Sequence, residues 1–389
     1  MSSPRLLVLG AGPAQLGLLE AARARGDLHV IAADRDAAAI GFPLADERAV
    51  ISTEDEQAIE RLARARHVAG IVSPGADWPV GIAARTCEKL GLPHPISAAT
   101  GTIATTKTRQ RECFAAAGVP HAATVDPAQP TFPCVVKAPD RQGQRGLALV
   151  RDPAELEAAL AQARAESRGG AVLVEELIEG PELTANGVFR DGVFFPLTLT
   201  DRMLADPPAF GVALAHVWRA SAPVEGAFDV AAAACSAIGI EQGPVYVQLR
   251  VAADGPRVME VAARLGGGHD AELCEVAMGV DLAATAIAFA LGERLSPVAL
   301  LPVPGLVGGA CVRFLVPPEG TLVRVDGAEE ALALPGVRAV RIYRQPGHVF
   351  GPFRRGADRA GAVLAAGATR EEALARAADA ADAVRFVVA

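Results

Sequence analysis

Three lysines stand out in this chain because every other basic residue is an arginine, and two of them, Lys107 and Lys137, are candidates for phosphate binding. Of its 37 basic residues, only Lys89, Lys107 and Lys137 are lysines. Lysine offers a compact point charge on a flexible stem, whereas arginine offers a broad planar fork. Lys137 precedes a polar loop, residues 141–146, that contains two glycines, and a point charge beside such a loop is suited to holding phosphate. The alternative interpretation is codon bias that spared three lysines by chance.

A second candidate is an amide and a carboxylate on a predicted hairpin. Two alternating segments flank a turn that we centre on Asp254, and this places Gln248 opposite Glu260 on one face of the hairpin. Such a pair can bind Mg²⁺, whose remaining positions phosphate oxygens and water would fill. Arg264 follows on the same face and would reach an anion beside the metal. A register error of one residue would remove the pair, and a polar pair at a sheet edge is the alternative.

Two further segments combine polar side chains with glycine. Residues 175–182 follow a short apolar run, and carboxylates there could accept hydrogen bonds from the amine and hydroxyl groups of a ligand. Residues 266–268 are three glycines, which let the backbone approach a ligand closely. The alternatives are a solvated acidic turn for the first segment and a flexible strand-to-helix turn for the second.

The elements that must position these residues follow an alternating α/β pattern. A short apolar strand at residues 6–9, a glycine turn, a helix to about residue 25 and a strand ending at Asp34 resemble a dinucleotide fingerprint. The alternative is a Rossmann-like half whose glycine turn is structural or touches a substrate. In either case the carboxyl ends of the strands, including residues 74–77, should face one crevice.

Further along the chain we expect a helix from Lys107 to about residue 117 and a strand at residues 134–137. A strand at 147–150 and a helix of about a dozen residues from residue 152 follow.

Composition excludes several classes of protein. A length of 389 residues favours two or three domains. An apolar fraction of 51% without any stretch of about 20 apolar residues argues against a membrane partner. A net charge of −8 argues against general nucleic-acid binding. Six scattered cysteines without a CxxC pair predict reduced thiols, and with no signal peptide at the N-terminus we expect a cytoplasmic protein.

Taken together, these motifs resemble those of the ATP-grasp ligases, from about residue 5 to about residue 300. The most similar variety is the carbamoyl-phosphate-synthetase-like group, which includes the L-amino acid (dipeptide) ligases. The resemblance implies an α/β (α+β) fold in three parts. These are an N-terminal Rossmann-like domain at 1–95, an ATP-grasp domain at 96–300 with a mobile lid at about 120–180, and a small C-terminal domain at 301–389.

The resemblance also implies a site for ATP and Mg²⁺ (or Mn²⁺). The residues expected to bind the phosphates are Lys107, Lys137, Gly143, Arg145 and Gly146. Those expected at the nucleoside are Glu175 and the backbone of Ile178 for adenine, and Glu182 for ribose. Gln248 and Glu260 would bind the metal. Arg264 and His216 are the expected catalytic residues, and the expected substrate contacts are Arg264, Gly267, Gly268, His269 and Arg313.

The implied activity is ATP-dependent ligation of a small-molecule carboxylate to an amine through an acyl phosphate, on amino acids or a small carboxylate, with a homodimer common among similar enzymes. One position departs from the pattern: the family commonly reads Glu-x-Asn-x-Arg, and this chain has Ala262 in place of the asparagine. The alternatives are therefore a non-catalytic or regulatory nucleotide-binding protein and, on the glycine turn alone, an NAD-dependent oxidoreductase.

Overall fold

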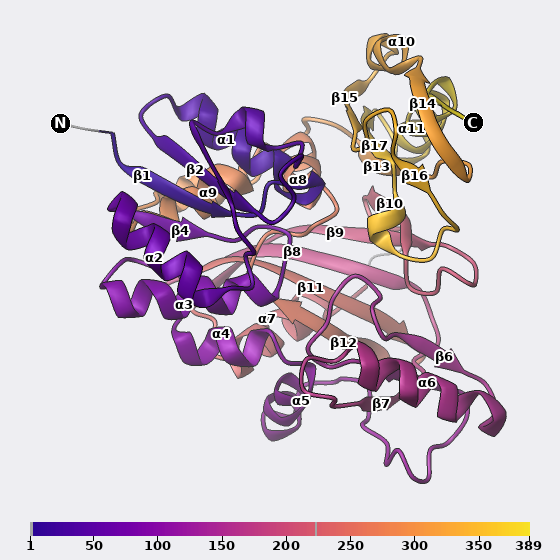
Figure 1. Ribbon diagram of the computed structural model, residues 1–389. Helices are drawn as coiled ribbons and strands as arrows, with labels where there is room; N and C mark the ends of the chain where they lie inside the picture. The colour runs from indigo at the N-terminus through magenta and orange to yellow at the C-terminus, as the bar shows by residue number, and fades with distance from the viewer. Residues whose placement is uncertain (1–2, 222–223) are drawn as a thin grey trace.

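The computed structural model describes residues 3–221 and 224–389. Its N-terminal part is a parallel sheet whose described strands run in the order β3-β2-β1-β4 (Figure 1). The elements are β1 (Arg5–Leu9), η1 (Pro13–Gln15), α1 (Leu16–Arg25), β2 (His29–Asp34), η2 (Phe42–Leu44), β3 (Glu47–Val50), α2 (Glu56–Arg66), β4 (Gly70–Val72) and α3 (Trp78–Leu90). Residues 6–9 are fully buried, as expected for a parallel strand covered on both faces.

A central sheet forms the body of the molecule, with its described strands in the order β12-β11-β8-β9-β10-β13-β17-β15. Two helices lead toward it, α4 (Ala98–Ala104) and α5 (Lys107–Ala116). The elements that follow the lid are β8 (Glu182–Arg190), β9 (Val193–Leu204), β10 (Ala213–Trp218), α7 (Ala227–Ala237), β11 (Gly243–Ala252), β12 (Gly255–Ala262), α8 (Asp270–Met278), α9 (Leu282–Ala290) and η3 (Pro297–Leu300).

The lid is a small separate unit that projects at the lower right of Figure 1. It consists of β5 (Cys134–Lys137), β6 (Ala148–Val150), α6 (Pro153–Glu166) and β7 (Leu173–Glu176). Its strands run in the order β6-β5-β7, and α6 packs on them through a hydrophobic cluster of its own that includes Val136, Leu160 and Val174. A unit with its own core can move as one body.

The C-terminal segment continues the central sheet. It contains β13 (Gly309–Leu315), β14 (Gly320–Asp326), α10 (Ala328–Ala333), β15 (Val337–Ile342), β16 (Val349–Phe350), η4 (Gly356–Asp358), β17 (Gly361–Gly367), α11 (Arg370–Ala383) and β18 (Arg385–Val388). Strand β13 pairs with β10, with Val312 opposite His216. The sheet therefore runs across the expected division at residue 300, and the domain boundaries stay a prediction.

Helices α8 and α9 join the N-terminal part to the body. Leu282 and Ile287 share a hydrophobic core with Leu6 and Val8 of β1. No single helix of the described residues is long and apolar enough to cross a membrane, and α8 with α9 meets the length and composition criteria only as a pair bent by 118°.

Candidate active site

A cavity of about 450 Å³ lies where the N-terminal loops, the lid, the central sheet and the C-terminal segment meet. Its wall contains twelve of the sixteen predicted site residues. The four that the structure places elsewhere are Gly146, Glu175, His269 and Arg313. The loops after β1 and β4 both reach the wall, through Gln15 and Asp77, as expected for the carboxyl ends of a parallel sheet.

Positive charge dominates this wall. Among the described lining residues only three are carboxylates, Asp77, Glu182 and Glu260. Nine are cationic: Lys107, Lys137, Arg141, Arg145, Arg202, Arg250, Arg264, Arg344 and Arg359. The whole chain carries a net charge of −8, so the surplus is local. A concave site with this imbalance attracts polyanionic ligands.

Both singled-out lysines lie on the cavity wall. Lys107 begins α5, and its Nζ is 2.7 Å from Glu260 Oε1 and 2.7 Å from the backbone oxygen of Arg141. Lys137 ends β5, and its ammonium group pairs with Glu175. Burial lowers the pKa of Lys137, against the opposing effect of Glu175. The two ammonium groups thus come from different elements to one cavity.

Glu175 lies behind Lys137 and does not line the cavity, which differs from the expected adenine contact. It sits opposite Val135 in the pairing of β5 with β7, and its fully buried carboxylate is also paired with Arg111. Burial favours the neutral acid, but Lys137 and Arg111 outweigh that effect and lower the pKa of Glu175 to about 2. The side chain therefore supports Lys137 in this structure.

Part of the cavity wall is apolar, which suits a planar base. Val135, Leu177, Ile178 and Met259 line it. The carboxylate of Glu182, also on the wall, forms an ion pair with Arg202, whose Nε lies 2.6 Å away, and accepts a hydrogen bond from Arg250 Nη2 at 3.2 Å. Such a wall offers a ring-binding surface and a hydroxyl acceptor.

The predicted opposition of Gln248 and Glu260 is confirmed. The turn is tighter than expected: Ala252 pairs with Gly255, so the pairing there is one residue out of the predicted register. A bulge between Gln248 and Leu249 restores the register, because Met259 is an extra residue in β12. Without this bulge a regular ladder would place Met259 opposite Gln248.

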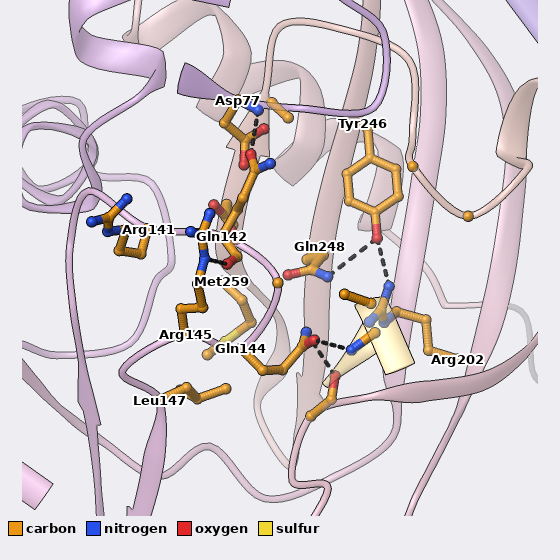
Figure 2. A pocket seen from close by; sticks show the side chains of 18 of the residues that line it. Asp77, Arg141, Gln142, Gln144, Arg145, Leu147, Arg202, Tyr246, Gln248 and Met259 are labelled. Carbon is orange, nitrogen blue, oxygen red and sulfur yellow. Dashed lines mark hydrogen bonds between the residues drawn. The ribbon is translucent and has the colours of Figure 1, made fainter. Parts of the chain in front are cut away.

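The donors at this hairpin fit a weakly ligated divalent ion. Gln248 Nε2 lies 3.2 Å from the Tyr246 hydroxyl, and Figure 2 shows the amide oxygen directed away from Tyr246. One carboxylate oxygen of Glu260 pairs with Lys107. Burial would raise the pKa of Glu260, but the positive charge of Lys107 lowers it. Within the described residues, no group of three or more His, Cys, Asp or Glu could hold a metal unaided. Mg²⁺ completes such sparse sites with phosphate oxygens and water.

The segment of residues 138–147, which includes the glycine-containing loop, lines the cavity and contacts two other parts of the chain (Figure 2). Gln142 accepts a hydrogen bond from the backbone of Asp77, and Gln144 accepts one from the backbone of Gly356 at 3.1 Å. Gly143 and Arg145 line the cavity. Gly146 instead packs against the lid with φ of 65°, and its role is to let the loop turn.

His216 forms a buried dyad with Asp270. His216 Nδ1 lies 2.9 Å from Asp270 Oδ1, and Asp270 Oδ2 accepts from the backbone of Gly268 at 3.1 Å. Burial lowers the pKa of His216 and outweighs the effect of Asp270. Burial alone would raise the pKa of Asp270, but His216, Arg202 and the Gly268 amide bring it to about 2. A neutral imidazole that donates from Nδ1 satisfies all of these observations.

Arg264 and two glycines line the cavity near this dyad. Arg264 Nε lies 2.8 Å from Asp77 Oδ1, and its guanidinium carbon is 5.5 Å from the centre of the Tyr246 ring. A Cβ atom at Gly268 would lie 2.5 Å from His216 Cε1. Glycine at this position therefore makes room for His216.

Two expected substrate residues point elsewhere. His269 contacts Glu272 at 2.9 Å and the Tyr343 hydroxyl, so it supports the wall without lining it. Arg313 is followed on β13 by Phe314, and Phe314 lines the cavity whereas Arg313 does not. Because side chains alternate along a strand, Arg313 faces away from the cavity.

Several lining residues were missed from the sequence. They are Tyr246, Arg202, Arg250, Phe314, Tyr343, Arg344 and Arg359. Tyr246 and Arg250 could have been identified from the sequence, since each lies two residues from Gln248 and so on the same face of that strand. Arg202 and Phe314 come from strands that no motif marks, and Tyr343, Arg344 and Arg359 lie between elements.

The glycine turn near the N-terminus is held in place by hydrogen bonds within the protein. Asp34 accepts hydrogen bonds from the backbone of Ala11 and Asp36, both at 2.9 Å. Gln15 accepts from the backbone of Gly12 and donates to the backbone of Pro74. These contacts use Asp34 to hold the turn, which favours the structural interpretation of this motif over the NAD interpretation.

Comparison with known proteins gives the same assignment. Residues 104–298 match the family of the carbamoyl-phosphate synthase L chain ATP-binding domain, and residues 313–389 match the L-amino acid ligase C-terminal domain 2. The chain is 30% identical over 420 residues to formate-dependent phosphoribosylglycinamide formyltransferase of Burkholderia thailandensis, covering 100% of this chain and 96% of that one. It is 27% identical to human carnosine synthase 1, covering 76% of this chain and 40% of that longer protein.

Solved structures show the same fold. The L-amino acid ligase from Bacillus licheniformis superposes with a TM-score of 0.84 at 22% identity over the full length of both chains. The biotin carboxylase domain of 2-oxoglutarate carboxylase from Hydrogenobacter thermophilus, solved with MgADP, gives 0.79 at 20% identity, covering 100% of this chain and 91% of that one. Together with the matched families, these similarities show that the chain belongs to the ATP-grasp enzymes and is an ATP-dependent carboxylate–amine ligase.

Proposed function

We propose that the protein joins an amino acid or another small carboxylate to an amine in two steps. The γ-phosphoryl group of ATP is transferred to a carboxylate oxygen, giving ADP and an acyl phosphate. The amine nitrogen then attacks the acyl carbon, phosphate leaves, and the amine loses a proton. The observation that carries this proposal is the cationic cavity that has the Gln248–Glu260 pair on its wall.

The protein contributes mainly by positioning and charge neutralisation. Lys107, Lys137 and Arg145 would bind the phosphates, while Ile178 and Glu182 would contact the nucleoside. Gln248 and Glu260 would hold Mg²⁺ (or Mn²⁺), which when bound shields the charge of the phosphate oxygens.

At the reacting group, Arg264 would orient the carboxylate and then its phosphorylated form. Gly267 and Gly268 would let the backbone approach it, beside His216. Because an acyl phosphate hydrolyses readily, closure of the lid would exclude water. The contacts of the 138–147 loop with Asp77 and Gly356 support this closure.

The experiment is incubation with ATP, Mg²⁺ and pooled amino acids, with ADP and phosphate measured and products identified by mass spectrometry. We expect ADP release that depends on the pool, with an amide product in equal amount. ADP release that no carboxylate stimulates would overturn the proposal.

Ala262 is the one residue that favours a second function, that of a non-catalytic nucleotide-binding protein. The residue lies on the cavity wall, opposite Tyr246 in the hairpin, and its side chain has no oxygen to offer a metal. Nucleotide binding without substrate-dependent ADP release would favour this function.

We also propose a cytoplasmic location, which the six free cysteines support, and a homodimer, which sedimentation analysis would test.

A further inference from the structure

A chain of three hydrogen-bonded side chains runs from the cavity wall into the protein. Tyr343 follows β15 and lines the cavity, and its hydroxyl oxygen lies 2.5 Å from His269 Nε2. The other ring nitrogen, His269 Nδ1, lies 2.9 Å from Glu272 Oε1 on α8. Tyr343 and His269 are both buried. The two-step reaction proposed above uses none of these three groups.

The hydrogen bonds of this chain have a defined direction. Burial would raise the pKa of the Glu272 carboxyl, but His269 and Arg341 lower it, and a carboxylate can only accept. His269 Nδ1 is therefore the donor to Glu272, which leaves Nε2 as the acceptor for the Tyr343 hydroxyl. Burial raises the pKa of Tyr343, and the phenol keeps its proton at neutral pH. The chain can thus take up one proton at its cavity end, as hydroxyl–imidazole–carboxylate triads do.

Glu272 is held by contacts with two distant parts of the chain. Arg341 Nη2 lies 3.5 Å from Glu272 Oε1 and 2.6 Å from Glu20 Oε2 on α1. On the same helix, a Cβ atom at Gly17 would lie 2.5 Å from Glu272 Oε1, which is closer than van der Waals contact allows. Gly17, just after the N-terminal glycine turn, therefore makes room for this carboxylate. Helix α1 is thereby part of the support for His269.

The second step of the reaction requires a proton acceptor. When the amine nitrogen bonds the acyl carbon it gains positive charge, and a proton must leave before the amide is complete. The carboxylates of the described wall are unsuited to this task, because each of them is paired with a cation. The pairs are Asp77 with Arg264, Glu182 with Arg202, and Glu260 with Lys107.

His216 is less suited to accept this proton than His269. Its Nε2 lies 3.5 Å from Arg202 Nη1, so a proton gained there would place an imidazolium directly against a guanidinium. A proton on His269 Nε2 would face the oxygen of Tyr343 instead. Glu272, on the other side of the His269 ring, would balance its charge.

Positive charge around Tyr343 favours the same transfer. The charged groups that act on its hydroxyl are Glu272, Arg341, Arg344 and Arg359. Three of these four are guanidinium groups, which raise the energy of another cation nearby. A charged nitrogen bonded to Tyr343 would therefore lose its proton readily, whereas His269 has the Glu272 carboxylate in direct contact.

Resting on the proposed function, we propose that Tyr343 is a catalytic residue of the amide-forming step, with His269 and Glu272 as the groups that act through it. As the nitrogen bonds the acyl carbon and phosphate leaves, one N–H bond breaks and its hydrogen passes to the Tyr343 oxygen. The hydroxyl hydrogen of Tyr343 passes to His269 Nε2. The positive charge moves from the nitrogen to an imidazolium beside Glu272, and the proton returns to water by the same path after the amide leaves.

The test compares two nucleophiles, pooled amino acids and hydroxylamine, with the full-length protein, ATP and Mg²⁺. Amides and hydroxamates are measured by mass spectrometry, and ADP is followed through the first turnover. Hydroxylamine is the weaker base, so its nitrogen becomes more acidic on bonding and can lose its proton to water. Its reaction should therefore depend less on a proton acceptor in the protein.

Tyr343→Phe and His269→Gln should lower kcat for amide formation by about a hundredfold to ten-thousandfold, the usual contribution of a positioned proton acceptor. KM for the amino acids should be nearly unchanged. The loss with hydroxylamine should be smaller by about tenfold or more. Glu272→Gln should show the same selective loss. The first-turnover release of ADP should match the wild type in all three variants, because formation of the acyl phosphate moves no proton through Tyr343.

The matched control is His348→Gln, which changes an exposed histidine that stacks on Phe350 outside the cavity and should leave both rates unchanged. Equal losses with the two nucleophiles would show that Tyr343 and His269 only shape the wall and would overturn the proposal. Unchanged rates would also overturn it and assign the proton to the leaving phosphate or to water, and a lost first turnover of ADP would overturn it as well. A wild-type protein that forms neither amide nor hydroxamate would refute the proposed function itself, so the two failures are distinguishable.

Discussion

At the scale of single residues, the site pairs most of its buried charges and leaves a few free. Lys107 with Glu260 and Lys137 with Glu175 are examples of paired groups. Pairing keeps the ammonium groups in place before a nucleotide arrives, which reduces the reorganisation needed during the reaction. Arg359, whose buried Nε has no hydrogen-bond acceptor in the described chain, is one of the groups left free.

Lys107→Met should lower kcat by about a hundredfold to a thousandfold, because it removes a preorganised positive charge from the phosphate end. Steady-state ADP release at saturating ATP measures the effect. The control is Lys89→Met, which removes the exposed lysine that pairs with Glu56 and should leave kcat unchanged. Similar losses in both variants would contradict the assignment of Lys107.

The His216–Asp270 dyad should make stability depend on pH. The pKa of His216 is lowered in the folded protein by burial, so below about pH 6.5 the unfolded chain binds a proton that the folded chain excludes. The free energy of unfolding should therefore fall as pH decreases from about 6.5, by up to about 1.4 kcal/mol per pH unit from this group. The pKa of Asp270 is also lowered, to about 2, so its contribution persists down to about pH 4 and is lost below it.

Chemical denaturation between pH 4 and 8 measures this dependence. His216→Gln should show a shallower slope than the wild type between pH 6.5 and pH 5. An identical slope in the two proteins would show that His216 does not exclude the proton.

At the scale of elements, the hairpin and the lid bring the site together. The hairpin depends on the Met259 bulge, which neither the turn residues nor the alternation reveals. The lid is attached to the N-terminal part by Arg168, whose guanidinium pairs with Glu54 at 2.7 Å and lies 4.2 Å from the Trp78 ring centre. These contacts lie outside the cavity and are made only when the lid is near the N-terminal sheet.

Arg168→Met should therefore loosen the closed lid. We expect the ratio of ADP formed to amide formed to rise about two- to fivefold, because a partly exposed ion pair contributes about 0.2–1 kcal/mol and water would reach the acyl phosphate. The control is Arg164→Met, an exposed position on α6 of the same lid. A ratio of one in both variants would show that Arg168 does not hold the lid.

At the scale of the whole molecule, an acidic protein surrounds a basic cavity. Anionic ligands should therefore stabilise the fold, and the amount should depend on the divalent ion. MgADP at about a hundred times its Kd should add about 2.7 kcal/mol to the free energy of unfolding, visible as a rise in Tm. ADP with EDTA should give a smaller rise, and NAD none.

Glu260→Gln is the matched variant for this measurement, since it keeps the shape of a proposed metal ligand and removes its charge. It should lose most of the difference between MgADP and ADP with EDTA. Equal shifts with and without the metal in the wild type would contradict the assignment of Gln248 and Glu260.

Local sequence patterns determined the positions of several helices and strands and identified part of the candidate site. Helix α5 begins at Lys107 and β5 spans Cys134–Lys137, as the apolar runs and turn residues predicted, because periodicity and turn chemistry act over a few residues. The lysines, the Gln248–Glu260 pair and Arg264 were identifiable because they occur in motifs with characteristic order and spacing.

Only the tertiary structure decided which groups share the cavity. Strands β8 to β10 bring Arg202 and His216 to it, and the pairing of β13 with β10 selects Phe314 over Arg313. Likewise, Glu175 is withdrawn behind Lys137 by contact with Arg111, which is 64 positions away in the chain. Which face of a strand is buried, and which charges are paired, depends on neighbours distant in sequence, and local patterns carry no record of them.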